Sequence, residues 1–270
     1  MNDFEYWRLI DTGMLSGPEN MAIDEALLCS FDQCSKPILR LYGWHPAAIS
    51  LGRFQKAREV LDTGRCHVDK TTIVRRITGG GVIYHADELT YSIICAPEQI
   101  PETNSIKDSF RVLTGFLLRF YRDLGLDAGY AVDGHDSGEK LGERTPFCFA
   151  GKESYDILVN GRKIGGNAQR RLKRIVFQHG SIPILDRLAD GVACLRYCPE
   201  NLAGRVTCLA AQGVVRDTEY LKTVLKNAFC SNLDTSLRET GLSDHELRMA
   251  DSLLLEKYLN DNWNLNGEGD

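Results

Sequence analysis

The amino-acid sequence predicts an α+β fold, with mixed β-sheets flanked by helices. Strand-like and helix-like runs follow one another without the regular strand–helix alternation of a doubly wound parallel sheet. The run 105–124 carries apolar residues at steps of three and four, the period of an α-helix. The dipeptide Asn160-Gly161 lies between two strand-like runs and is a strong signal for a hairpin turn. A chain of 270 residues is long enough to bury one large core around these elements.

The N-terminal part indicates one helix among short strands. Ser16 and Glu19 have the spacing of a capping box, and Pro18 between them suits the first turn of a helix. We therefore expect a helix over 18–31. Short runs rich in β-branched, aliphatic and aromatic residues predict strands at 6–10, 38–42, 48–51, 73–76, 82–84 and 89–95.

The middle of the chain contains a loop followed by the hairpin. The stretch 133–144 is polar and rich in glycine, so we expect a surface loop there. The hairpin and the element after it give three predicted strands, at 154–159, 162–169 and 175–184.

The C-terminal part is predicted to be helical, over 217–229 and 243–259. Ser243 and Glu246 form a second capping-box pattern at the start of the last helix. We expect a core at 1–190, with a helical portion at 191–270 packed on the same domain.

Composition excludes several classes of function. The net charge of -5 argues against nucleic-acid binding, and no apolar run approaches the length that a membrane span needs. The acidic, aromatic N-terminus is unlike a signal peptide, so we expect a cytoplasmic protein that binds no membrane. The nine cysteines include no CxxC pair, and Cys194 and Cys198 lack the partners of a zinc site, so no metal centre is predicted.

The chemistry is expected between residues 146 and 170. Cys148 precedes the hairpin, Lys163 follows its turn, and Gly165-Gly166 leave the backbone bare. A thiol, an amine and open backbone N–H groups suit acyl transfer. Taken singly, a cysteine such as Cys148 is more often a buried structural residue than a catalytic one, and a lysine such as Lys163 is most often solvated at the surface. Nearby lysines and arginines favour the thiolate form of Cys148, which is the nucleophilic one.

A second candidate region surrounds Gly79, Gly80 and Gly81. Three glycines between strands can present N–H groups to a phosphate or a carbonyl, although a flexible connection explains them as well. Arg76 precedes the loop and His85 follows it. Because Arg75 and Arg76 alternate on a strand, at most one of them points to a site.

Two further features lie beyond the hairpin. His179 can approach Cys148 only if its strand pairs beside the hairpin. The basic run 170–174 is either a solvated face or a docking patch for an acidic carrier domain.

Several motifs in order resemble the lipoate-protein ligase A / biotin protein ligase catalytic-domain family. They include W-R-L-I-D-T-G near the start, R-R-I-T-G-G-G-V-I-Y-H, D-E-L-T-Y-S, C-F-A-G-K-E-S-Y-D-I, G-R-K-I-G-G-N-A-Q and Q-H-G-S-I-P-I. The match spans nearly the whole chain, and such an ordered set is more specific than any single motif. The resemblance is strongest to the octanoyltransferase branch of the family.

The resemblance implies a mixed sheet surrounded by helices, with an acyl chain in a hydrophobic tunnel. It implies transfer of an octanoyl group from octanoyl-acyl carrier protein to a lysine of a lipoyl domain, of the glycine cleavage H protein or 2-oxoacid dehydrogenase E2 type. Cys148 matches the cysteine that carries the acyl group as a thioester, and Lys163 matches the invariant lysine. The expected substrate-binding residues are Arg76, Gly79, Gly80, Gly81, His85, Gly165, Gly166, Asn167, Ala168 and His179.

One departure keeps a second reaction open. The octanoyltransferase branch commonly has an arginine where this chain has Gly81, and the glycine is closer to the ATP-dependent ligases. The transferase requires no cofactor, whereas a lipoate or octanoate ligase would use ATP and Mg and pass through an acyl-AMP. A non-catalytic module that binds acyl carriers is a third alternative, disfavoured because both Cys148 and Lys163 are present.

Overall fold

A mixed six-stranded sheet forms the centre of the protein in this computed structural model, which describes residues 6–32, 34–101, 105–134, 153–198 and 201–268. β1 pairs in parallel with both β2 and β13, whereas β2, β6, β11 and β10 pair antiparallel. In spatial order the strands are β10 (Gly166–Leu172), β11 (Ile175–Pro183), β6 (Glu88–Cys95), β2 (Ile38–Trp44), β1 (Trp7–Leu15) and β13 (Leu237–Glu239).

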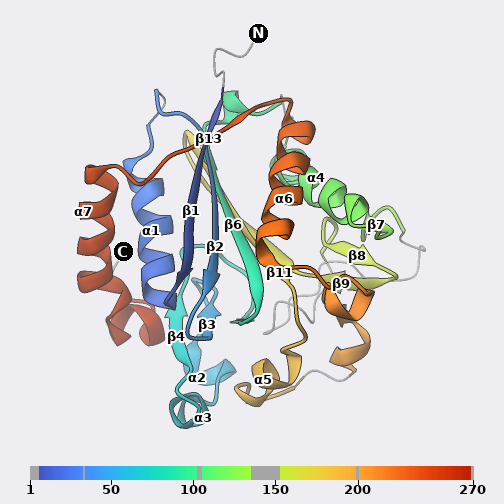
Figure 1. Ribbon diagram of the computed structural model, residues 1–270. Helices are drawn as coiled ribbons and strands as arrows, with labels where there is room; N and C mark the ends of the chain where they lie inside the picture. Colours follow the sequence, from blue (N-terminus) through green and yellow to red (C-terminus); the bar gives the residue numbers. More distant parts are fainter. Residues whose placement is uncertain (1–5, 33, 102–104, 135–152, 199–200, 269–270) are drawn as a thin grey trace.

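Helices cover both faces of this sheet (Figure 1). α1 (Gly17–Ser30) and α7 (Asp244–Leu253) lie on one face, and α4 (Ile106–Asp123) and α6 (Thr218–Leu233) lie on the other. The apolar side chains of α4 pack with those of the sheet in one core, while α1 closes a second core. The strands are therefore buried from both sides, which explains why β2 and β6 contain no exposed residue.

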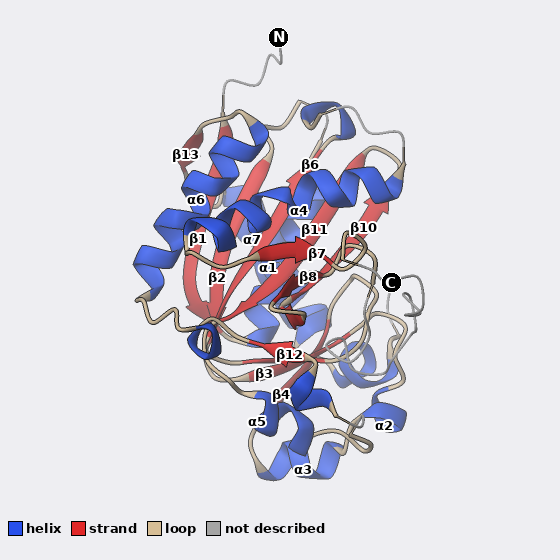
Figure 2. Cartoon of the chain, turned by 90° about the vertical axis from the view of Figure 1, so that its right-hand side faces the viewer, coloured by secondary structure: helices blue, strands red, loops and turns tan. Residues whose placement is uncertain are grey.

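Two smaller sheets complete the fold. One contains β4 (Thr72–Arg75), β3 (Ala48–Leu51) and β5 (Ile83–His85), and the other β12 (Val206–Thr207), β9 (Arg162–Ile164), β8 (Ile157–Val159) and β7 (Ala128–Tyr130). Figure 2 shows β3, β4 and β12 below the large sheet, next to the short helices α2 (Ala57–Val60), α3 (Thr63–Val68) and α5 (Leu188–Ala193). Single turns of 3-10 helix lie at Pro97–Gln99, Leu202–Gly204 and Ala210–Gln212.

The α+β class and most predicted elements are confirmed. Ser16 and Ser243 each form the predicted capping box. Residues 160 and 161 have φ of 50° and 73°, so both occupy the left-handed region that a two-residue hairpin turn requires. Within the described residues, no helix combines the length and the apolar character needed to cross a bilayer.

Three predicted elements differ from the structure. The first strand continues to Leu15 rather than ending at residue 10. The strand expected at 162–169 is two strands in different sheets, because Gly165 takes a φ of +82° and turns the chain between β9 and β10. The last α-helix ends at Leu253, and π-helical turns follow at Leu254–Tyr258 and Asn262–Asn266.

The C-terminal part also supplies strands that the sequence did not predict. β13 extends the large sheet next to β1, and β12 pairs with β9. Both are very short, so they carry too few residues to show a period of two.

Candidate functional site

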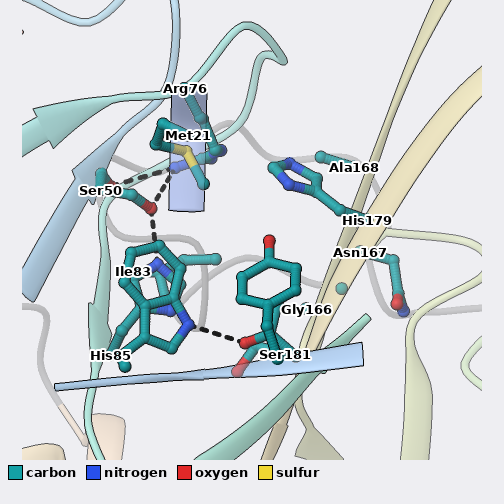
Figure 3. Close-up of a pocket in the computed structure, with 14 residues that line it drawn as sticks. Met21, Ser50, Arg76, Ile83, His85, Gly166, Asn167, Ala168, His179 and Ser181 are labelled. Atoms are coloured by element: carbon teal, nitrogen blue, oxygen red, sulfur yellow. Dashed lines mark hydrogen bonds between the residues drawn. The ribbon is translucent and has the colours of Figure 1, made fainter. Parts of the chain in front are cut away.

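An apolar cavity lies between the small sheet of β3 and β5 and the large sheet of β6 and β11 (Figure 3). We call it the first cavity. It contains about 360 Å³ of space outside the atoms, part of it open to solvent. Met21 of α1 and the aromatic side chains of Tyr42 and Trp44 line it together with Ile83. These apolar walls suit a hydrocarbon chain.

Six of the predicted site residues line this cavity: Arg76, His85, Gly166, Asn167, Ala168 and His179. In Figure 3 Arg76 and His85 lie on one side of the cavity, with Ala168, Asn167 and His179 on the other. The two sides come from different sheets, which is why the residues are far apart in the sequence. Ala168 and His179 are direct partners in the β10–β11 ladder, so His179 does lie beside the strand that follows the hairpin.

A directional chain of hydrogen bonds runs along the Arg76 side. The Arg76 guanidinium donates to Ser50 Oγ at 3.1 Å, and Ser50 Oγ lies 2.7 Å from Nε2 of His85. Nδ1 of His85 is in turn 2.8 Å from Oε1 of Glu88. Because the Glu88 carboxylate only accepts, Nδ1 of His85 carries the proton and Nε2 accepts from Ser50. His85 is thereby held in one tautomer.

Glu88 is the residue of this network that sequence reasoning missed. Its carboxylate also accepts from Thr90 Oγ1 at 2.5 Å and from Ser181 Oγ at 2.6 Å, and the side chain is buried. Thr90 in turn accepts from the Trp44 indole, whose ring stacks on His85 at 3.9 Å. A glutamate at the start of a strand looks like an ordinary surface residue, so only the three-dimensional structure reveals its role.

His179 is held on the opposite side of the cavity. Its Nε2 lies 2.7 Å from Thr78 Oγ1, and its Nδ1 lies 3.7 Å from a carboxylate oxygen of Asp24. Burial lowers the pKa of the His179 imidazole, and the attraction of Asp24 opposes this only in part. A neutral imidazole between a hydroxyl and a carboxylate is able to accept a proton.

Asp24 remains a carboxylate although it is fully buried. Burial alone would raise the pKa of its carboxyl, but the Arg40 guanidinium at 2.7 Å, together with His179 and Ser92, lowers it overall. Tyr42, which lines the cavity, also donates to Asp24 at 2.9 Å. A buried ion pair of Asp24 and Arg40 therefore lies behind the His179 wall of the cavity.

The glycine loop folds around Arg76. The Arg76 guanidinium donates to the carbonyl oxygens of Gly79 at 2.9 Å and of Gly81 at 2.7 Å, and Gly80 has a φ of +96°. Any side chain at Gly80 would press against the guanidinium. The three predicted glycines thus fix the position of Arg76 rather than line the cavity themselves.

Arg75 points away from the cavity, as the alternation of a strand predicts. Its guanidinium donates to the carbonyl oxygens of Trp263 at 2.8 Å and Leu265 at 3.0 Å, and to that of Gln55 at 2.6 Å. The C-terminal turn is thereby attached to the strand that leads into the glycine loop.

Lys163 and Gly165 lie on the hairpin next to the cavity, without lining it. The Lys163 ammonium is buried and lies 2.7 Å from Oδ2 of Asp156. Gly165 passes so close to the Ser181 carbonyl that no Cβ would fit. Cys148 and most of the predicted loop at 133–144 lie outside the described residues. No cluster of metal-ligating side chains is present in the described ranges.

The fold and the cavity define a class of protein: an α+β domain with an apolar ligand cavity beside a glycine loop and a lysine-bearing hairpin. More specifically, the chain belongs to the family of the lipoyl protein ligase A/B catalytic domain, whose model matches residues 16–233. The resemblance inferred from the motifs is therefore confirmed.

Individual proteins extend this similarity over nearly the whole chain. The chain is 34% identical to octanoyltransferase LipM of Bacillus subtilis (strain 168) over 275 residues, covering 96% of this chain and 98% of the relative. Among solved structures, a candidate lipoate protein ligase from T. acidophilum with bound lipoic acid superposes with a TM-score of 0.80 at 26% identity, covering 96% and 99% of the two chains. A lipoate-protein ligase A bound with ATP gives a TM-score of 0.82 at 25% identity, covering 97% and 100%.

Proposed function

We propose that this protein is a cytoplasmic octanoyltransferase of protein lipoylation. It takes an octanoyl group from octanoyl-acyl carrier protein and passes it, through a thioester on Cys148, to a lysine of a lipoyl domain. The acceptor is a glycine cleavage H protein or a 2-oxoacid dehydrogenase E2 domain. The observation that carries the proposal is the first cavity, whose walls suit a hydrocarbon chain, in a chain that resembles octanoyltransferases over its full length.

The first half of the reaction forms the enzyme thioester. The Cys148 thiolate attacks the carbonyl carbon of the donor thioester, and the pantetheine thiolate leaves and takes up a proton. Charge that develops on the carbonyl oxygen needs a nearby donor or cation. Lys163, held as an ammonium by its ion pair with Asp156, suits this role better than that of a proton acceptor.

The second half transfers the acyl group to the acceptor. The lysine amine of the lipoyl domain attacks the Cys148 thioester, an amide bond forms, and the cysteine thiolate is released. The amine must lose a proton in this step. His179 is a suitable acceptor, because burial lowers the pKa of its imidazole and so keeps it neutral.

The proposal is tested by intact-mass analysis of the wild type and the Cys148→Ser variant with an apo lipoyl domain. One series receives octanoyl-acyl carrier protein without ATP, and the other receives free octanoate with ATP and Mg. The expected result is an octanoyl adduct on the wild type alone, which passes to the acceptor without ATP. Full transfer by Cys148→Ser would exclude the covalent route.

A second candidate function is ATP-dependent ligation of octanoate or lipoate. It is favoured by Gly81, which matches the ligases, and by the similarity to a lipoate-protein ligase A whose structure contains ATP. A nucleotide-bound Mg needs only one or two protein carboxylates, so the described residues are compatible with it. This reaction would be established if the acceptor were modified only when ATP is present, and if Cys148→Ser modified it as well as the wild type does.

A further inference from the structure

A second cavity lies behind β5, on the side opposite the first cavity. Its position follows from strand alternation: Ile83 and His85 line the first cavity, while Tyr84 between them lines the second. The second cavity is larger, with about 730 Å³ of space outside the atoms, part of it open to solvent. Helix α5 and the segment 203–211 provide much of its remaining wall.

A hydrogen bond connects the walls of the two cavities. Glu88 lines the second cavity, and its carboxylate accepts from Ser181, which lines the first, at 2.6 Å. The hairpin joins them as well, since Arg162 lines the second cavity and Gly166 lines the first. Lys163 lies between these two residues in the sequence.

The second cavity differs from the first in its charge. Apolar side chains such as Leu188 and Val206 form part of its wall, and four charged residues also line it: Arg162, Arg187, Glu88 and Asp186. Arg187 is paired with Asp87 at 2.6 Å. The guanidinium of the half-buried Arg162, in contrast, forms no hydrogen bond or ion pair with another described residue. A half-buried guanidinium of this kind is suited to an anion, above all a phosphate.

We propose that the second cavity binds the phosphopantetheine arm of the acyl donor, with its phosphate at Arg162. This inference rests on the octanoyltransferase function proposed above. The donor thioester has a hydrocarbon chain on one side of its reactive carbonyl and an amide-containing arm with a terminal phosphate on the other. The two cavities match these halves in polarity.

The proposal is tested first by binding. Calorimetry compares 4′-phosphopantetheine with pantetheine, which differs only in lacking the phosphate, on the full-length protein. We expect the wild type to bind the phosphorylated compound at least tenfold more tightly, and Arg162→Ala to reduce this ratio to less than twofold. Arg205→Ala, an exposed arginine nearby that lines neither cavity, is the matched control and should keep the ratio.

A steric variant and donor kinetics provide the second measurement. Ala211→Phe fills part of the second cavity from an exposed position, so it should weaken 4′-phosphopantetheine binding while octanoate binding is unchanged. With octanoyl-4′-phosphopantetheine as donor, Arg162→Ala should raise KM about tenfold and leave kcat unchanged. With octanoyl-pantetheine, neither constant should change.

The outcomes separate this inference from the proposed function. The inference would be overturned if the wild type bound 4′-phosphopantetheine and pantetheine with equal affinity. It would also be overturned if Arg162→Ala weakened the binding of both compounds by the same factor, even if octanoyl transfer occurs. Binding of ATP but not of 4′-phosphopantetheine, abolished by the same two variants, would assign the cavity to a nucleotide instead. Phosphate-dependent binding through Arg162 would support the site even if no acyl transfer were found.

Discussion

The ammonium of Lys163 lies 2.7 Å from the carboxylate of Asp156, and both side chains are buried. Asp156 directly precedes β8, and Lys163 is the middle residue of β9, so the pairing of the two strands brings them together. A buried ion pair contributes little to net stability, because desolvation of both charges offsets their attraction. The ion pair instead fixes the position of one positive charge on the hairpin that precedes Gly166, a residue of the first cavity.

Asp156→Asn is therefore expected to affect Lys163. Removing one partner leaves a buried charge without its counter-ion, at a cost of about 3 kcal/mol in the free energy of unfolding. Urea denaturation measures this change. The double variant Asp156→Asn/Lys163→Met removes both charges and should be less destabilised than Asp156→Asn alone. If the two variants are equally destabilised, the ion pair does not position Lys163.

Glu88→Gln should destabilise the network between the cavities. The amide replaces one accepting oxygen by a donor, so at least one of the hydrogen bonds from His85, Thr90 and Ser181 is lost. We expect a loss of roughly 2 kcal/mol in the free energy of unfolding, since the group is buried. Glu98→Gln, at an exposed position, is the control and should leave the free energy of unfolding unchanged. A similar effect of the two substitutions would show that the network adds no stability.

His179 should make the protein less stable in mild acid. Burial lowers the pKa of the folded imidazole, whereas the unfolded side chain titrates near about 6.5. Above that pH both states are neutral. As the pH falls below it, the unfolded state takes up the proton first, so the free energy of unfolding decreases down to the lowered folded pKa.

Urea titrations between pH 8 and about pH 5 test this dependence. His179→Gln keeps a polar side chain and should show a flatter pH profile over that interval. Equal slopes for the wild type and His179→Gln would contradict the assignment of this dependence to His179.

Gly165→Ala should cost more stability than Gly161→Ala. Both glycines have a positive φ, of +82° and +73°, so both substitutions introduce backbone strain of about 1 kcal/mol. A methyl group at Gly161 meets open space, whereas at Gly165 it overlaps the Ser181 carbonyl. Thermal or urea denaturation gives the free energy of unfolding of each variant, and the difference between the two values is the cost of this overlap. Equal losses would mean that the β9–β10 junction moves to accommodate the methyl group.

Local sequence signals were sufficient for the elements that depend on local physics. The capping box at Ser16, the turn at Asn160-Gly161 and the amphipathic helix α4 depend on residues within a few positions of one another. Gly165 shows the limit of such signals. Its neighbours continue a strand pattern, and only the approach of Ser181 from a different strand explains why the chain turns there.

The candidate site was predictable in part for the same reason. The family motifs include Arg76, His85 and His179, all of which line the first cavity. The motif D-E-L-T-Y-S contains Glu88 but does not indicate its role, because its partners come from β5, β6 and β11. The ion pair of Lys163 was also missed, since a carboxylate seven positions earlier has no recognisable local pattern.

The attachment of Arg75 to residues 263–265 affects the order in which the protein is built. A ribosome completes β4 and the glycine loop long before it translates Trp263 and Leu265, whose carbonyl oxygens Arg75 requires. Until then, a fully buried guanidinium next to Arg76 lacks two of its acceptors. The nascent chain can pair the three central strands β1, β2 and β6 of the large sheet early, because all of them precede residue 96. The strand that leads to Arg76 and the first cavity gains its last contacts, those of Arg75 with Trp263 and Leu265, only late in synthesis. The central strands of the protein can therefore fold before this side of the candidate site is complete.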